Sequence, residues 1–206
     1  MSQFRKAAWF DFMAPLYDFI CNIFGMNESY RKEIISKLQI KGNMRILDAG
    51  CGTGSLAIDM AKSGSKKVFA IDPDPKILEI AKRKAIKNNV KVDFRNSYMQ
   101  KLPFPDGYFD VVISSLVFHH IPGEKGKRNA IKEVKRVLKW NGTFMISDFG
   151  RAKIFSIGPW LAATFEEGQE NYKGMIPEMM KEEGFKDVKV AKEYKFGIQM
   201  VRGIKR

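Results

Sequence analysis

Short apolar runs alternate along the chain with longer segments in which apolar residues recur every three or four positions. The short runs are typical of β-strands and lie at 44–48 (MRILD), 68–72 (VFAID), 90–95 (VKVDFR), 109–114 (FDVVIS) and 143–148 (TFMISD). The spacing predicts helices over about 54–63, 76–88 and 124–139. Strands separated by helices form parallel βαβ units, so the pattern predicts a doubly wound, mostly parallel α/β sheet.

Some of these segments also predict which residues are buried and where the chain turns. The run at 109–114 is continuously apolar, as expected of a strand that is buried on both faces. Asn141-Gly142 predicts a turn before the fifth strand. Helical spacing predicts the buried faces of two helices: Ile77, Ile80, Ala81 and Ala85 in one, and Ala130, Ile131, Val134, Val137 and Leu138 in the other.

The two ends of the chain follow a different pattern. Residues 155–168 and 174–183 are predicted helices, and 186–194 and 197–205 are predicted strands separated near Gly197. Two strands joined so tightly must pair antiparallel, which places one reversed strand at or near the edge of the sheet. Residues 1–40 are predicted to form one or two helices packed on top of the sheet.

Length and composition indicate one soluble domain. The chain has 206 residues, of which 45% are hydrophobic and 29% charged. We divide it into a helical cap (1–40), a central unit (41–150) and a C-terminal unit of helices and a strand hairpin (151–206). No apolar run approaches the roughly 18–20 residues of a membrane span, and the N-terminus lacks an apolar signal core. We therefore expect a cytoplasmic protein, while the pattern leaves the oligomeric state open.

Few residues are available for metal binding or disulfides. Cys21 and Cys51 cannot make a disulfide framework or a four-ligand zinc site. The adjacent His119 and His120 cannot supply a clustered site either, so we expect no metal.

Positive charge is concentrated in two predicted helical regions. The formal net charge is +13, from 36 basic and 23 acidic residues. Residues 60–101 carry eleven Lys/Arg against four Asp/Glu, and residues 120–140 carry seven against two. Such a face is usually just solvated, but it can also attract an anionic membrane or nucleic acid. Lysine enrichment also occurs in heat-adapted proteins.

Three glycines in five residues, Gly50, Gly52 and Gly54, follow the first predicted strand. This is where an open α/β sheet binds its ligand, and glycine lets a ligand touch the main chain. The dinucleotide fingerprint G-x-G-x-x-G requires a glycine where this chain has Ser55. The loop is therefore predicted to bind a different ligand.

Two carboxylates define that ligand further. Asp48 precedes the loop, where it would repel a pyrophosphate but suit a cationic amino group. Asp72 ends the second predicted strand, where a carboxylate can accept both ribose hydroxyl hydrogens. The predicted ligand is a nucleoside with a ribose, a positive charge and no phosphate.

Three motifs in order, ILDAGCGTG, AIDPDP and LPFPDGYFDVVISSLVFHHI, resemble those of class I S-adenosylmethionine-dependent methyltransferases. Within that superfamily the chain is similar to the group of quinone C-methyltransferases and phosphatidylethanolamine N-methyltransferases, and the N-terminal FDFMAPLYD adds to the likeness. The resemblance is specific over 44–150. It implies S-adenosylmethionine as cofactor and a Rossmann-like, seven-stranded sheet with one antiparallel strand and an N-terminal helical lid.

The resemblance also implies roles for individual residues. Asp48 and the loop residues Gly50, Cys51, Gly52 and Gly54 would meet the methionine part of the cofactor. Asp72 would hold the ribose and Pro73 would pack on the adenine. Where the family often has Gly-Asp-Ala, this chain has Ser97-Tyr98-Met99, which leaves a backbone N–H at Met99 for the adenine. The carbonyl of Ser114 would face the cofactor amino group, and Tyr17 would close over its carboxylate.

Candidate general bases are His119, Asp148 and Tyr17. His119 follows the fourth predicted strand and should face the mouth of the site, although a histidine there can also be merely packed. His120 is expected to be structural. An amine acceptor would need little help from a base.

The predicted acceptor is a small molecule or a lipid. After the fourth predicted strand the chain reads Ser114-Ser115-Leu116-Val117, without the N/D-P-P-Y/F loop that clamps a flipped base. Seven aromatic residues over 4–24 predict either a lid over an apolar acceptor, helped by Trp160 and Phe165, or packing onto the sheet. Alternatives are an RNA or protein methyltransferase using the basic surface, a non-catalytic binding module, and an NAD-dependent oxidoreductase.

Overall fold

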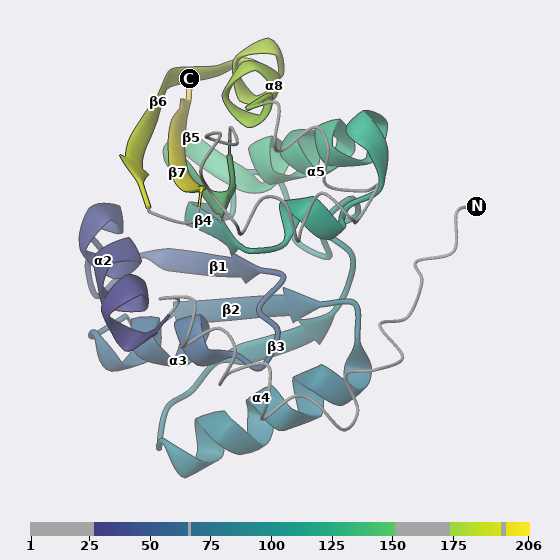
Figure 1. Ribbon diagram of the computed structural model, residues 1–206. Coiled ribbons are helices and arrows are strands. Elements are labelled where there is room, and N and C mark those ends of the chain that lie inside the picture. Colours follow the sequence, from purple (N-terminus) through teal and green to yellow (C-terminus); the bar gives the residue numbers. More distant parts are fainter. Residues whose placement is uncertain (1–26, 66, 151–173, 195–196) are drawn as a thin grey trace.

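The computed structural model describes residues 27–65, 67–150, 174–194 and 197–206 (Figure 1). Within these ranges seven strands form one sheet in the order β3-β2-β1-β4-β5-β7-β6. The strands are β1 (Arg45–Ala49), β2 (Lys67–Asp72), β3 (Asp93–Asn96), β4 (Phe109–Ser115), β5 (Leu138–Phe149), β6 (Phe185–Glu193) and β7 (Ile198–Lys205). The predicted helix over 155–168 and the predicted aromatic lid over 4–24 lie outside the described residues.

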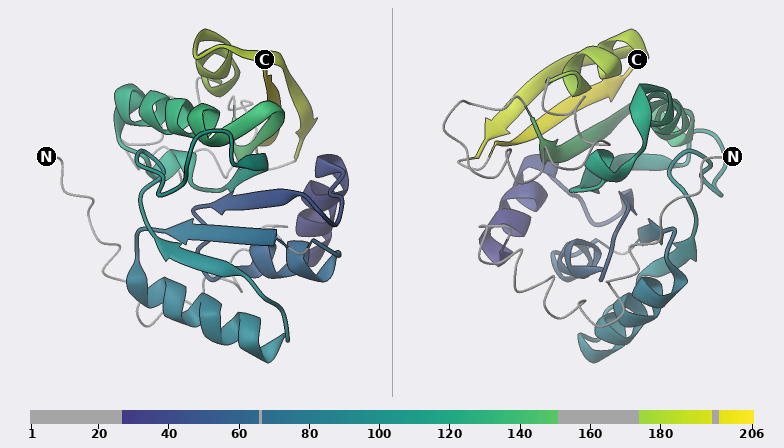
Figure 2. Two further views of the ribbon diagram at one scale, coloured as in Figure 1. Left: turned by 180° about the vertical axis from the view of Figure 1, so that it is seen from behind. Right: turned by 45° about the vertical axis from the view of Figure 1, so that its right-hand side comes forward.

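The strand directions confirm the predicted fold class. The pairs β1–β2, β1–β4, β2–β3 and β4–β5 are parallel, while β7 runs antiparallel to both β5 and β6. The reversed strand therefore lies one place inside the edge of the sheet, as the hairpin near Gly197 predicted (Figure 2). The result is a Rossmann-like, mostly parallel seven-stranded sheet with one antiparallel strand.

Apolar side chains cover both faces of the sheet. The helices are α2 (Glu28–Leu38), α3 (Ser55–Lys62), α4 (Pro75–Lys87), the 3₁₀ turn η1 (Phe118–His120), α5 (Gly123–Val137) and α8 (Ile176–Glu182). Val112 of β4 packs in a core cluster with residues of α5 and α8, whereas its neighbour Ile113 packs in a second cluster with residues of α2 and α3. Burial on both faces explains why 109–114 is continuously apolar.

The predicted buried face of α5 is confirmed, and that of α4 is partly wrong. The five apolar residues predicted over 130–138 are all fully buried. In α4 the buried stripe is Leu78, Ala81 and Ala85, while Ile77 and Ile80 are only half-buried. Since α4 packs at the edge of the sheet against β2 and the short β3, its buried stripe is narrow and does not reach the flanking isoleucines.

The predicted turn at Asn141-Gly142 lies inside a strand rather than before it. Helix α5 ends at Val137, and β5 begins directly at Leu138 with extended backbone. Phe109 pairs with Leu138 and Val111 with Thr143, so the residues between bulge out of the sheet. Asn141 adopts a φ of 62°, and a Cβ on Gly142 would lie 2.8 Å from the Lys139 carbonyl oxygen, which explains why a tight bend here needs these residues.

Helix α2 connects the two halves of the sheet. Asn27 caps its first turn by accepting a hydrogen bond from the Tyr30 N–H (3.3 Å). Glu33 accepts a hydrogen bond from the Tyr194 hydroxyl (2.9 Å) and pairs with Lys192 at the end of β6. The part of residues 1–40 that the structure describes thus packs on the sheet as predicted.

Over the described ranges, no helix combines the length and the apolar character that crossing a membrane requires.

Candidate functional site

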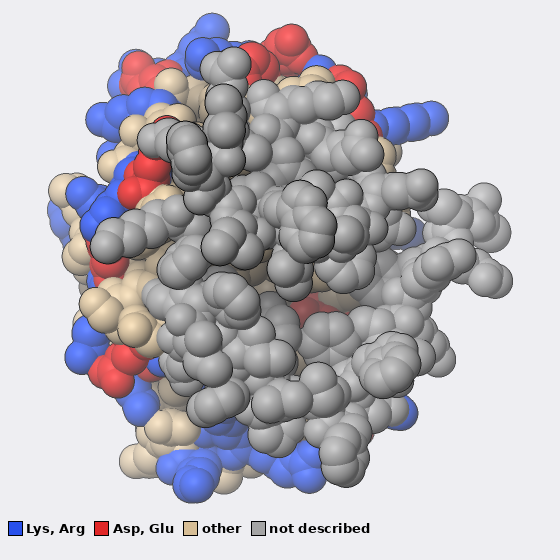
Figure 3. All heavy atoms as spheres, in the orientation of Figure 1, with Lys and Arg blue, Asp and Glu red and all other residues tan. Residues whose placement is uncertain are grey.

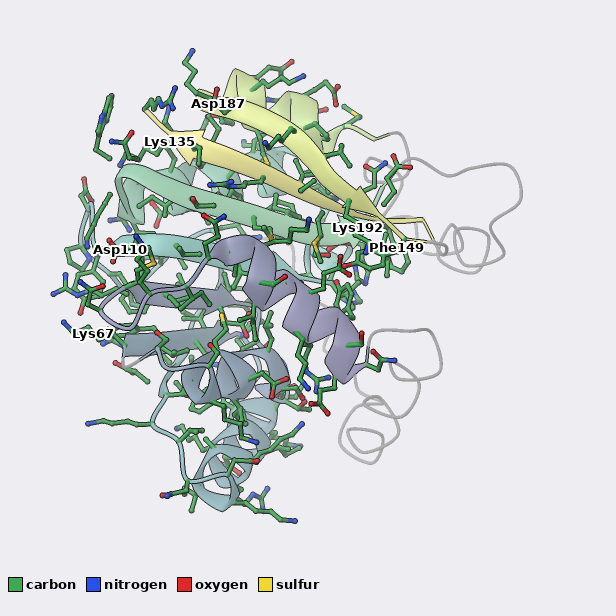
Figure 4. All side chains as sticks on the ribbon, turned by 90° about the vertical axis from the view of Figure 1, so that its left-hand side faces the viewer. Lys67, Asp110, Lys135, Phe149, Asp187 and Lys192 are labelled. Atoms are coloured by element: carbon green, nitrogen blue, oxygen red, sulfur yellow. The ribbon has the colours of Figure 1, made fainter. Side chains whose placement is uncertain are left out.

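The polar residues singled out from the sequence gather at one edge of the sheet. Parallel strands end on the same side, so β1, β2, β4 and β5 bring their carboxyl ends together. Figure 4 shows this polarity, with Lys67 at the start of β2 on one side and Phe149 at the end of β5 on the other. Asp48, Asp72, Ser114 and Asp148 all lie within two residues of such a strand end.

A sharp turn follows β1 at this edge. The backbone N–H groups of Gly50 and Cys51 both donate to the carbonyl oxygen of Ile71, each at 2.8 Å. Gly50, Gly52 and Gly54 have φ values of 85°, 52° and 78°, a region that side-chain-bearing residues rarely adopt. The turn delivers the chain directly into α3, which begins at Ser55.

The three glycines face different surroundings. A Cβ on Gly50 would lie 2.4 Å from Val117 Cγ2, and one on Gly54 would lie 2.9 Å from the Cβ of Ala81. A Cβ on Gly52 would meet nothing within 4 Å. Gly50 and Gly54 thus allow close packing of the protein, whereas Gly52 presents bare backbone to open space.

Asp72 holds the turn in place. Its Oδ2 accepts the Gly52 N–H (3.0 Å) and its Oδ1 accepts the Asp74 N–H (2.9 Å). Burial raises the pKa of this carboxyl, and the two N–H bonds oppose the rise. Each carboxylate oxygen has a second lone pair, so Asp72 can still accept hydrogen bonds from a ligand.

Asp48 is buried beside the turn with one oxygen unused. The residue is 1% exposed, and its Oδ2 has no hydrogen-bond partner among the described residues. Burial and the charge of Asp72 raise the pKa of Asp48 to about 7, although a hydrogen bond from the Ala57 backbone acts against them. A buried, unsatisfied carboxylate oxygen is costly, so the site favours a ligand that supplies a hydrogen-bond donor or a positive charge.

The same two carboxylates also affect Cys51. Burial, together with the charges of Asp48 and Asp72, raises the pKa of its thiol well above the usual range. Cys51 therefore stays a neutral thiol. Its backbone forms part of the loop, and its side chain fills space there.

Ser97-Tyr98-Met99 lies next to the end of β2. The Ser97 N–H donates to the Asp72 carbonyl oxygen (3.2 Å), and its hydroxyl donates to the Lys101 carbonyl oxygen (2.8 Å). Tyr98 is 50% exposed, whereas Met99 is buried in the core on the α5 side. The side chain of Met99 thus packs, and only its backbone is available to a ligand. Pro73 is half-exposed beside this segment.

Two residues of α5 hold the segment that follows, and sequence reasoning missed them. Glu133 accepts the Leu102 N–H (2.8 Å), and Arg136 donates to the carbonyl oxygens of Leu102 (3.1 Å) and Phe104 (2.9 Å). Glu133 and Arg136 also pair with each other. Their spacing of three residues predicts a surface ion pair, but nothing in the sequence indicates that both reach a distant loop.

His119 and Asp148 form a hydrogen-bonded pair. His119 Nδ1 lies 2.8 Å from Asp148 Oδ1, and the N–H of Phe118 donates to Asp148 Oδ2 (2.7 Å). Although burial alone would raise the pKa of Asp148, the neighbouring His119 and the Phe149 N–H hold it below its usual range. An ionised carboxylate only accepts, so Nδ1 of His119 carries the hydrogen that it donates to Asp148.

The other residues singled out from the sequence differ in placement. Tyr17 lies outside the described residues, and so do Cys21, Trp160 and Phe165. His120 is exposed, with its ring centroid 3.9 Å from that of His119. A hydroxyl group that sequence reasoning missed belongs to Tyr30, which donates to Ser147 Oγ (2.7 Å) and lies 3.2 Å from Ser115 Oγ.

Known proteins share this architecture. A family model described as "Methyltransferase domain" matches residues 47–146. A demethylmenaquinone methyltransferase of Lactobacillus johnsonii is 28% identical, with 87% of this chain and 84% of that protein covered. A ubiquinone/menaquinone biosynthesis C-methyltransferase of Geotalea daltonii is 29% identical, with 68% and 61% covered.

Solved structures agree on the fold. A SAM-dependent methyltransferase of Aquifex aeolicus superposes with a TM-score of 0.67 at 22% identity, covering 85% of this chain and 89% of that one. A phosphoethanolamine N-methyltransferase of Haemonchus contortus, in complex with phosphomonomethylethanolamine and S-adenosylhomocysteine, gives 0.75 at 22% identity, covering 92% and 46%. This chain is an S-adenosylmethionine-dependent methyltransferase.

The edge of the methyltransferase sheet fits that cofactor. The unsatisfied Oδ2 of Asp48 and the open backbone at Gly52 suit a cationic amino acid moiety. A second buried atom without a described partner is Ser114 Oγ, at the end of β4. Within the described part of the chain, no three His, Cys, Asp or Glu side chains are grouped so that they could hold a metal ion.

The glycines provide a matched pair of substitutions. Gly52→Val is expected to leave a folded methyltransferase that no longer binds S-adenosylhomocysteine, because its side chain would enter open space above the loop. Both substitutions strain a backbone with positive φ, but Gly54→Val is expected to lower thermal stability more, because its side chain would also collide with Ala81 and Phe94. Thermal unfolding and calorimetric titration of both variants check this. Normal cofactor affinity in Gly52→Val would contradict the placement of the site.

Proposed function

We propose that this methyltransferase methylates a small, lipid-like acceptor with an ionisable ring hydroxyl, of the quinol type. The observation that carries the proposal is the pair of His119 and the buried Asp148. A ring carbon becomes nucleophilic when a neighbouring hydroxyl loses its proton, so such an acceptor needs a base. The two relatives named above act on quinones, which supports the same class of acceptor.

The cofactor is assigned first to the end of β1 and the turn after it. In this assignment Asp48 binds the amino group of the methionine part, and the carbonyl of Ser114 faces the same group from β4. Gly50, Cys51, Gly52 and Gly54 form the wall along that part, with Gly52 making the closest approach because it has no Cβ and faces open space. Tyr17 is assigned to closing the site.

The adenosine part is assigned to the end of β2 and the loop after β3. Asp72 accepts the ribose hydroxyl hydrogens with the lone pairs that Gly52 and Asp74 leave unused. Pro73 packs on the adenine, and the Ser97-Tyr98-Met99 segment borders it, with the Met99 backbone N–H as donor. Glu133 and Arg136 keep this segment in position through Leu102 and Phe104.

The protein's share of the chemistry is orientation and proton removal. S-adenosylmethionine, when bound, supplies an electrophilic methyl group on a positively charged sulfur. His119 Nε2 takes the proton from the acceptor hydroxyl, and Asp148 keeps the proton on Nδ1 and stabilises the imidazolium that forms. The acceptor thus gains a methyl group and loses one proton to His119.

Cofactor binding is expected to depend on pH through Asp48. Its pKa of about 7 means that the carboxyl is largely protonated below pH 7 and must ionise to pair with an ammonium group. Affinity for S-adenosylhomocysteine should therefore rise as the pH increases from 6 to 8, by up to about tenfold per unit below pH 7, with release of a proton. Calorimetry in buffers of different ionisation enthalpy measures both effects.

The matched variants are Asp48→Asn and Asp59→Asn. The first should bind more weakly and without this pH dependence. The second removes a carboxylate that pairs with Arg31 on the surface and should behave like the wild type. A pH-independent affinity in the wild type would contradict the assignment of Asp48.

Methyl transfer from labelled S-adenosylmethionine tests the acceptor class. We expect transfer to a demethylmenaquinol analogue and not to phosphoethanolamine or RNA. His119→Ala and Asp148→Asn should lower turnover by about 10²- to 10⁴-fold, the range for loss of a general base, with little change in cofactor affinity. His120→Ala is the control and should retain activity. Transfer to phosphoethanolamine or RNA alone would contradict the proposal.

A further inference from the structure

Helix α4 presents cations and one apolar side chain to solvent. Lys82, Arg83, Ile86 and Lys87 are all exposed and recur at helical spacing outside the buried stripe of Leu78, Ala81 and Ala85. We call these four residues the α4 basic face. Lys91 is exposed just beyond the helix, and the only acidic residue in α4 is Glu79.

The two basic regions found in the sequence differ in the folded protein. In α5 both arginines are neutralised: Arg128 pairs with Glu124 and Glu182, and Arg136 pairs with Glu133 and Asp106. On α4, Lys82, Arg83 and Lys87 have no ion pair or hydrogen bond through their side chains to any described residue. Lys and Arg gather at the lower edge of the molecule in Figure 3, where α4 lies in Figure 1.

Ile86 distinguishes this face from an ordinary solvated helix. It is 78% exposed, more than any other large hydrophobic residue that the structure describes. It lies next to Lys87 and one turn beyond Lys82 and Arg83, so cations surround it. An isoleucine gains nothing from a phosphate backbone in water, but it gains free energy when it enters the headgroup and acyl boundary of a bilayer.

We propose that the α4 basic face docks the methyltransferase on an anionic membrane surface. Lys82, Arg83 and Lys87 supply the electrostatic attraction to anionic headgroups, and Ile86 inserts between them. The inference concerns a surface separate from the cofactor site and does not depend on which acceptor is methylated. Docking would bring the methyltransferase close to a lipid-like acceptor dissolved in the same bilayer.

Binding of the full chain to lipid vesicles tests the proposal. The probes are vesicles of phosphatidylcholine alone and of phosphatidylcholine with phosphatidylglycerol, measured by co-sedimentation. Wild type should bind only the anionic vesicles, and less at high salt. The variant with Lys82→Gln, Arg83→Gln and Lys87→Gln should bind about a hundredfold more weakly, at about fivefold per charge. Ile86→Ser alone should weaken binding about tenfold.

A second triple variant controls for net charge. Lys181→Gln, Lys186→Gln and Lys189→Gln remove the same number of exposed cations from α8 and β6, at the other end of the sheet. This variant should bind like the wild type, and all variants should keep their affinity for S-adenosylhomocysteine and their thermal stability.

Three results would overturn the proposal. The first is no binding of wild type to anionic vesicles. The second is an equal loss of vesicle binding in both triple variants, which would mean that the net charge of the protein, and not the α4 basic face, attracts the vesicles. The third is unchanged vesicle binding in Ile86→Ser together with tight binding of duplex RNA that the α4 triple variant loses, which would identify a nucleic-acid surface instead.

Discussion

The carbonyl oxygen of Ile71 accepts the backbone N–H groups of both Gly50 and Cys51, and the geometry of the site depends on this double hydrogen bond. It turns the chain sharply between β1 and α3. The turn requires positive φ at the glycines, places the Gly52 N–H on Asp72 and leaves Gly52 bare towards open space. A residue with a side chain at any of these three positions would strain the backbone, and at two of them it would also collide with the protein itself.

Electrostatics makes the same region receptive to a cation. Two carboxylates lie near each other in a largely buried place, and the charge of Asp72 raises the pKa of Asp48. The Oδ2 of Asp48 has no hydrogen-bond partner among the described residues, so a ligand with a positive donor would satisfy it. On the other side of β4, the pairing of Asp148 with His119 has the opposite effect, because a hydrogen-bonded neighbour keeps Asp148 ionised. The same sheet edge thus carries two carboxyl groups, Asp48 and Asp148, whose pKa values shift in opposite directions.

The sequence predicted the parts of this arrangement that depend on local pattern. The parallel pairing followed from strands that alternate with helices, and the reversed strand followed from the tight connection at Gly197. Asp48, Asp72 and the glycines could be found because they lie at or directly after the end of a strand. The bulge in β5 could not be placed, since Asn141-Gly142 suits a turn between elements and a turn within a strand equally well.

Contacts between elements that are distant along the chain could not be predicted from the sequence either. Glu133 and Arg136 reach the loop after β3, and Tyr30 reaches Ser147, only because the fold brings α5 and α2 over these strands. The difference in ion pairing between the basic residues of α4 and those of α5 could not be predicted for the same reason. Both segments are rich in lysine and arginine, but the acidic residues of α8 that neutralise Arg128 lie more than fifty positions later in the chain.

The assignment of the cofactor to the ends of β1 and β2 is tested most directly at Asp72. Calorimetric titration with S-adenosylhomocysteine would compare the wild type with Asp72→Asn and with Asp74→Asn, a neighbouring carboxylate whose described role is to cap α4. We expect Asp72→Asn to bind S-adenosylhomocysteine about ten- to a hundredfold more weakly, because hydrogen bonds to a charged acceptor are lost. Asp74→Asn should bind it with the affinity of the wild type. Unchanged affinity in Asp72→Asn would contradict the assignment.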